Sequence, residues 1–239
     1  MTAETEVRPS SAEAQVPQRG GLLRTVLLLV MAVALVLIGG GAAVVLGIGR
    51  QNSPAADSVD AGFAWDMSRH HLQGVQMANL ATGRSHDPLI LSLASDISAT
   101  QTNQVGRMQG WLSLWGLPNT SSRPPMQWMG GNPAAQMSAM QMAGMSMSGS
   151  AGDLMPGMAT QQELDQLASL SGTAFDVQFL RLMIRHHQGG LRMAQYTEQH
   201  AEVSAVRTLA RSIAETQTAE VQTMAQLLSE RGGTPLPAP

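Results

Sequence analysis

The chain has 239 residues, enough for one or two ordinary domains, and its formal net charge of −3 gives no positive field that would attract nucleic acid. The absence of cysteine excludes disulfides, thiolate metal sites and cysteine nucleophiles. Methionine is abundant, with 17 residues against three Phe and one Tyr. Its thioether is a soft core filler and also a soft metal ligand, so the composition leaves both uses open.

The N-terminal region predicts a polar tail followed by a membrane-spanning helix. Residues 25–49 carry no charge and are mostly Leu, Val, Ala and Gly. This segment is long enough to cross the hydrocarbon core and is longer than the apolar region of a cleaved signal peptide. Three arginines precede it and only Arg50 follows closely, so the positive-inside rule places the N-terminus in the cytoplasm and the rest outside. Cleavage near residues 54–56, giving a secreted protein, is the alternative.

The remainder of the chain predicts helices of 3.6-residue period separated by one long loop. Asp87 and Pro88 have the residue types of an N-cap and a first helical position, and Thr160 with Glu163 has the pattern of a capping box. The expected long helices cover residues 60–81, 89–115, 174–199 and 204–230, with a short helix over 160–170. Residues 117–159 are rich in Gly, Pro, Ser and Met without a usable period, which predicts a long, mobile loop.

A motif containing two adjacent histidines occurs twice. Phe63–Ala78 recurs as Phe179–Ala194, and the two copies are offset by 116 residues (186 − 70). The repeat extends further, because residues 60–116 align without a gap on 176–232 with 20 identical pairs in 57 positions. One amphipathic hairpin cannot bury its own apolar face, so we expect two hairpins to pack about a pseudo-two-fold axis.

The predicted fold class is therefore all-α, a four-helix bundle built from two repeated hairpins, plus one N-terminal transmembrane helix. The expected organisation is a cytoplasmic tail (1–21), a transmembrane helix (22–49), a linker (50–59), the first hairpin (60–116), a Met-rich flexible loop (117–159), a short helix with the second hairpin (160–232) and a C-terminal tail (233–239).

The histidine pairs, with methionines at helical spacing, are candidate metal ligands. Adjacent helical residues point about 100° apart, so we expect one histidine of each pair on the core stripe and the other on its flank. Gly74 and Gly190 lie one turn beyond the pairs and leave room for a close helix, a water or an ion. The candidate ligands are His70, His71, Met67, Met77, His186, His187, Met183 and Met193.

Imidazole and thioether together favour copper, with Met selecting Cu(I). Zinc would leave the methionines unused, and di-iron sites in bundles usually need Glu three residues before His, where this chain has Met67 and Met183. The alternative without metal is that each pair provides one buried, hydrogen-bonded histidine and one surface histidine.

The Met-rich loop is a possible second metal site. A flexible chain with thioethers at short spacing can place two or three of them on one soft ion, and thioethers do not titrate. The alternative is compositional drift in a low-complexity segment. The secondary candidates are Met137, Met140, Met142, Met145 and Met147.

The pattern Asp-x-x-Phe-x-x-x-Met-x-x-His-His-x-x-Gly-x-x-Met-Ala, present over 60–78 and again over 176–194, resembles the bacterial family called domain of unknown function 305. This resemblance implies a ferritin-like helical fold. It also implies copper binding, as in some secreted members, through the eight candidate ligands above. The first copy departs from the family by having Gln104 where the second copy keeps Glu220.

Together these observations predict a membrane-anchored, extracytoplasmic protein that binds copper for sequestration or handover and is not an enzyme. Its expected partners are a metal ion and the membrane, through residues 25–49, and no nucleic acid. The alternative is a structural or interaction module of the cell envelope that binds no metal and docks onto an envelope protein. Homo-oligomerisation stays open in both interpretations.

Overall fold

The computed structural model describes residues 19–45, 53–130 and 154–239, which belong to two separate units, 1–52 and 53–239. The first unit contains one helix, α1 (Arg19–Val45). It begins at Arg19, before the expected uncharged segment. The stretch Gly21–Ala42 is apolar and long enough to cross a membrane, which fits a membrane anchor or a signal sequence.

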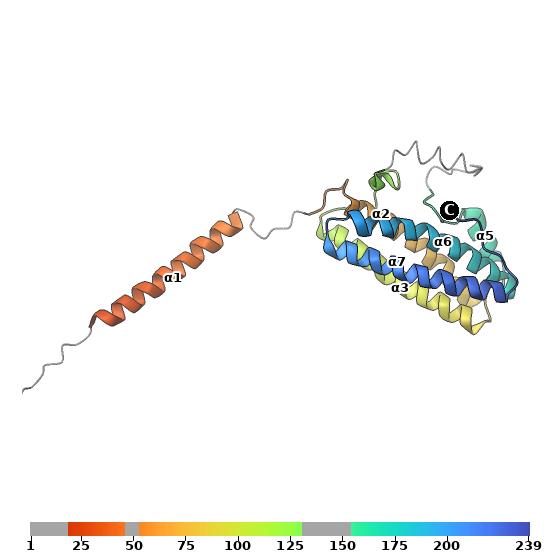
Figure 1. The fold of residues 1–239 in the computed structure, drawn as a ribbon, viewed down its shortest axis with the longest axis horizontal. Helices are drawn as coiled ribbons and strands as arrows, with labels where there is room; N and C mark the ends of the chain where they lie inside the picture. The colour runs from red at the N-terminus through yellow and green to blue at the C-terminus, as the bar shows by residue number, and fades with distance from the viewer. Residues whose placement is uncertain (1–18, 46–52, 131–153) are drawn as a thin grey trace, which may run out of the picture. The chain divides into compact units, whose positions relative to one another are not determined.

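The second unit is a bundle of four long helices (Figure 1), and the described residues contain no strand. Its elements are α2 (Val59–Asn79), η1 (Ala81–Gly83), α3 (Pro88–Leu114), η2 (Gln127–Met129), α5 (Gln161–Ser169), α6 (Gly172–His200) and α7 (Ser204–Glu230). Helix α2 packs along α3, α6 packs along α7, and α2 against α6 joins the two hairpins. The prediction of an all-α bundle made from two helical hairpins is confirmed.

Side-chain caps fix where several of these helices begin. The Ser58 side chain accepts a hydrogen bond from Ala61 N at the start of α2, and Asp87 accepts one from Leu89 N before α3. Thr160 and Glu163 form a reciprocal capping box at α5. Each cap satisfies backbone N–H groups that have no partner inside the helix.

The core of the bundle consists of two apolar clusters. One contains Phe175 and Phe179 near the start of α6, together with Met77 and Met183. The other contains Phe63 near the start of α2, and its buried methionines include Met67 and Met193. Because each histidine pair lies in sequence between a methionine of one cluster and a methionine of the other, the histidines form a layer between the two clusters.

Residues 117–130, the described start of the segment expected to be a mobile loop, make polar contacts with the bundle. Asp66 accepts hydrogen bonds from Met126 N and Trp128 Nε1, both at 2.7 Å, and Trp65 Nε1 donates to Pro118 O at 2.7 Å. These polar anchors and the packing of Trp128 against the bundle hold 117–130 in place. The five secondary candidates, Met137 to Met147, lie outside the described residues.

Candidate metal centre

All four histidines of the repeated motif are fully buried, with 0% exposure. This corrects the expectation that only one histidine of each pair is buried in the core and that the other lies on a flank or at the surface. A helical wheel assumes that a helix buries a single stripe of residues. Helix α2 instead packs against both α3 and α6, so two of its faces are buried. His71 therefore points to α3, where it meets Gln104, while His70 meets His186 of α6.

The rings of His70 and His186 stack against each other across the pseudo-two-fold axis. Their centroids are 3.8 Å apart and their planes are inclined by 31°. His186 Nε2 lies 2.8 Å from the backbone oxygen of His70, and His70 Nε2 lies 3.1 Å from the backbone oxygen of Pro156. The outer two rings bond to neighbouring helices: His71 Nε2 is 2.7 Å from Gln104 Oε1, and His187 Nε2 is 2.7 Å from Glu220 Oε2.

These partners determine which ring nitrogen carries the proton. A carbonyl or carboxylate oxygen only accepts a hydrogen bond, so the Nε2 atoms of His70, His186 and His187 must donate, and the Gln104 amide oxygen assigns His71 the same way. In a neutral imidazole the other nitrogen, Nδ1, then has a free lone pair. All four Nδ1 atoms are buried and have no hydrogen-bond partner within the described parts of the chain.

Burial keeps the rings of His70, His71 and His186 neutral. Desolvation lowers the pKa of His70 from 6.5 to about 4 and that of His71 to about 3, and neighbouring imidazoles add to the effect. The pKa of His186 is also well below 6.5, chiefly through desolvation. At neutral pH these nitrogens can bind a cation without first losing a proton.

The buried methionines lie on both sides of the histidine layer. Met67 and Met193 belong to one apolar cluster, and Met77 and Met183 belong to the other. Across the described residues, no three His, Asp or Glu side chains are arranged to hold a metal ion. A site with three or more ligands in this layer would therefore need thioether or amide donors in addition to imidazole.

The space beside each glycine is filled by side chains from both hairpins. A Cβ at Gly74 would lie 3.0 Å from His186 Cε1 and 2.2 Å from Gln101 Oε1. At Gly190 it would lie 3.2 Å from His70 Cε1 and 2.8 Å from Gln217 Oε1. Each glycine thus forms a notch that receives a histidine ring from the other hairpin and a glutamine from its own. Neither glutamine was a candidate, although both occupy equivalent positions of the repeat.

Residues 154–159, here called the strap, lie against the histidine layer. Gln73 holds the strap by donating to Ala159 O at 2.9 Å and accepting from Ala159 N at 2.7 Å. On the α6 side, a Cβ at Gly189 would lie only 1.9 Å from Pro156 O, so only glycine permits this approach. The strap supplies the backbone oxygen that receives the His70 hydrogen bond, and no sequence pattern predicted that role.

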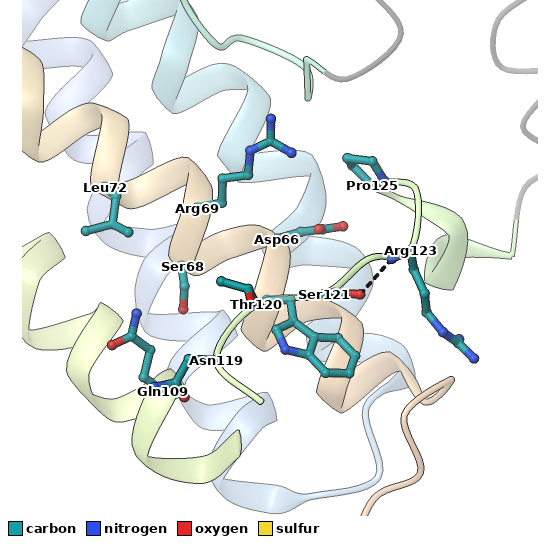
Figure 2. Close-up of a pocket in the computed structure, with 11 residues that line it drawn as sticks. Asp66, Ser68, Arg69, Leu72, Gln109, Asn119, Thr120, Ser121, Arg123 and Pro125 are labelled. Carbon is teal, nitrogen blue, oxygen red and sulfur yellow. Dashed lines mark hydrogen bonds between the residues drawn. The ribbon is translucent and has the colours of Figure 1, made fainter. Parts of the chain in front are cut away.

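A surface cavity of about 330 Å³ lies elsewhere, between α2, α3 and residues 119–125 (Figure 2). Its α2 wall includes Trp65, Ser68, Arg69 and Leu72, which lie on the face of the helix turned away from the histidines. None of the four histidines lines it, and Figure 2 shows the side chains of Arg69 and Arg123 pointing apart. This cavity is not part of the histidine centre.

Comparisons with known proteins agree on one family. The family described as domain of unknown function DUF305 matches residues 60–228. A crystal structure of a DUF305 protein from Streptomyces coelicolor, named as secreted, is 43% identical with a TM-score of 0.66, covering 77% of this chain and 99% of that one. A DUF305 fragment from Deinococcus radiodurans is 30% identical with a TM-score of 0.55, covering 72% and 96%.

A third solved structure, CopM in the Cu(II)-bound form, is 26% identical with a TM-score of 0.52, covering 72% of this chain and 97% of that one. A search among curated proteins gave no match.

Proposed function

This chain belongs to the DUF305 family, and from that premise we propose that its bundle binds copper through the histidine layer and the methionines beside it. CopM, a family relative by structure, is known in a Cu(II)-bound form. The proposal concerns copper as cargo, held for sequestration or handed to another protein.

The observation that carries the proposal is the arrangement of the four imidazoles. Each Nε2–H is held by an oxygen acceptor, while each Nδ1 keeps a buried lone pair without a partner in the described residues. Histidines that bind metals usually donate their second ring N–H to a carbonyl or carboxylate, which fixes the tautomer and raises the basicity of the ligand nitrogen. A merely structural histidine would have little reason to leave a buried acceptor unpaired.

The side chains around the layer favour copper over other metals. Thioethers select Cu(I), imidazole accepts either oxidation state, and the bundle has no thiolate. Met67, Met77, Met183 and Met193 are all fully buried beside the layer. Their thioethers are the soft donors that the bundle offers in addition to the imidazoles.

We propose binding without catalysis. All four imidazoles are shielded from solvent, and an organic substrate has no exposed ring to approach. A small ion needs only a local opening of the bundle or strap, which suits slow capture and release.

We also propose that α1 is retained as a single-pass anchor with the bundle on the extracytoplasmic side. Support comes from the length of the apolar stretch and from the excess of arginines before it. Membrane fractionation and protease accessibility of the bundle in intact cells test this. Recovery of a shortened chain from the medium would contradict it.

The test of copper binding is a Cu(I) titration of the full-length chain in detergent, in competition with a chelator. The test variant changes His70, His71, His186 and His187 to Ala. The matched control changes the exposed His86 and His200 to Ala. We expect tight binding in wild type and control and its loss in the test variant, with helical circular dichroism confirming that the variant still folds.

Two other outcomes are informative. Binding that survives in the test variant would move the site to the Met-rich segment. No binding in wild type would refute the copper proposal and favour the envelope interaction module.

A further inference from the structure

Gln101 and Gln217 are buried polar side chains without polar partners. Each is only 3% exposed. The amide nitrogen and the amide oxygen of both residues have no hydrogen-bond partner among the described groups. Buried amides are normally satisfied, because the energy lost on desolvation must be recovered from a new bond.

Both amides lie at the histidine centre. Gln101 Oε1 and His186 Cε1 meet in the Gly74 notch, and Gln217 Oε1 and His70 Cε1 meet in the Gly190 notch. Since the centroids of these two rings are 3.8 Å apart, each glutamine lies beside one ring of the same central pair.

A packing role does not explain these two residues. Leucine or methionine would fill a similar volume without a desolvation cost, and both are used at neighbouring core positions such as Met108 and Leu209. Yet both halves of the repeat have glutamine at this position (217 − 101 = 116). A polar group that is buried, unpaired and present in both halves indicates a polar ligand.

We propose that Gln101 and Gln217 complete the histidine centre as oxygen donors for Cu(II), together with Nδ1 of His70 and His186. This inference rests on the proposed copper function and adds the chemistry of the oxidised ion to it. Cu(II) prefers nitrogen and oxygen ligands, whereas Cu(I) prefers thioethers. The centre then holds the two oxidation states with different donors: amide oxygens for Cu(II) and methionine sulfurs for Cu(I).

The absence of a three-residue group of His, Asp and Glu agrees with this assignment within the described residues. Imidazoles alone do not supply enough donors there. The amide oxygens are neutral, so they add ligands without placing a negative charge in the core, where an unpaired charge is costly.

The experiment compares both oxidation states in the full-length chain. The test variant carries Gln101→Leu and Gln217→Leu. The matched control carries Gln76→Leu and Gln195→Leu, at exposed positions of α2 and α6. Cu(II) affinity is measured by competition with glycine, Cu(I) affinity by competition with a Cu(I) chelator under anaerobic conditions, and the Cu(II) ligand set by electron paramagnetic resonance.

We expect the test variant to lose Cu(II) affinity by about tenfold or more and to change the Cu(II) spectrum, while its Cu(I) affinity stays within about twofold of wild type. Its melting temperature without metal should not fall, since the replaced amides have no partner to lose. Unchanged Cu(II) affinity would overturn the proposal. Parallel loss of both affinities with a lower melting temperature would also overturn it, because it would indicate a structural role.

A second variant, Gln101→Glu with Gln217→Glu, keeps the oxygen donors and adds charge. We expect Cu(II) to raise its melting temperature more than it raises that of wild type, and an equal or smaller rise would contradict the proposal. A wild-type chain that binds neither ion would refute the copper function itself. A wild-type chain that binds both, with glutamine variants that bind both equally well, would refute only this inference.

Discussion

The two hairpins share their histidine positions but differ in what those histidines contact. His71 in the first hairpin bonds to the neutral amide of Gln104, and His187 in the second bonds to the carboxylate of Glu220, both at 2.7 Å. An anionic acceptor forms the stronger hydrogen bond with the Nε2–H and so makes Nδ1 more basic. The repeat has thus kept its geometry while giving the second hairpin the stronger candidate ligand.

The hairpins also contact the strap differently. The first hairpin holds it through the Gln73 amide, and the second permits its approach through Gly189, the residue at the equivalent repeat position (189 − 73 = 116). One position of the repeat therefore supplies a polar clamp in one copy and free space in the other. The strap can lie across the histidine layer only because the two copies have diverged.

The largest expected effect is an acid-induced loss of stability in the metal-free protein. The pKa of His70 falls from 6.5 to about 4 on folding. Between these two pH values the unfolded chain therefore binds a proton at His70 that the native state does not bind. Stability is complete above pH 6.5 and declines as the pH falls toward 4, by roughly 3 kcal/mol for His70 alone. Urea unfolding between pH 7 and pH 4 measures this.

His71 and His186 steepen the same decline, because their pKa values are lowered too. Changing His70 to Gln should flatten the profile, because it removes the group whose pKa is lowered on folding. A flat wild-type profile over this pH range would contradict the burial of neutral imidazoles.

The next effect concerns the strap. Gly189→Ala places a Cβ against Pro156 O, a backbone atom that cannot move alone, and should cost roughly 3 kcal/mol. Gln73→Ala leaves the backbone groups of Ala159 unpaired and should cost about 2 kcal/mol. Denaturant unfolding of both variants and of the double variant measures the coupling, and strictly additive effects would show that the two contacts do not hold one strap.

A charge exchange tests the difference between His71 and His187. Glu220→Gln should weaken copper binding by about tenfold, and Gln104→Glu should strengthen it, because the acceptor on Nε2 sets the basicity of Nδ1. Copper competition titrations measure both variants, with Glu215→Gln, another carboxylate of α7, as the control. Equal affinities in all variants would mean that neither outer histidine contacts the ion.

The smallest expected effect is a difference in stability between variants of two arginines at equivalent positions of the repeat. Arg185 forms a salt bridge with Glu163 at 2.7 Å and is only 19% exposed, so Arg185→Ala should cost about 1 kcal/mol. Arg69, its repeat counterpart, has no salt bridge within the described residues, and Arg69→Ala should be nearly neutral. Thermal unfolding of the two variants compares them, and an equal cost would show that the Glu163 contact contributes little.

The fold could be predicted because its signals are local or repeated. Caps such as Asp87, the 3.6-residue apolar period and the offset of 116 residues depend only on the order of residues in the chain. Burial of both histidines in each pair could not be predicted in this way. It depends on α2 touching two neighbours at once, and a helical wheel represents one helix alone.

The polar groups around the histidines were only partly visible in the sequence. Gln101 and Gln217 are identical in both copies, which is a usable signal, but their sequence gives no measure of burial or of missing partners. The contact at Pro156 could not be predicted from the sequence, because it depends on a backbone oxygen and on a glycine of another helix.

The contact between His186 and the carbonyl of His70 also sets an order of events during synthesis. The ribosome releases the first hairpin before α6 exists, so at that stage its Gly74 notch lacks the ring of His186, and His70 lacks the ring that covers it. The central ring pair forms only when residue 186 arrives and folds back across 116 positions of chain. A nascent or truncated chain therefore holds only half of the centre, and under the proposed function copper loading would have to wait until the second hairpin has folded.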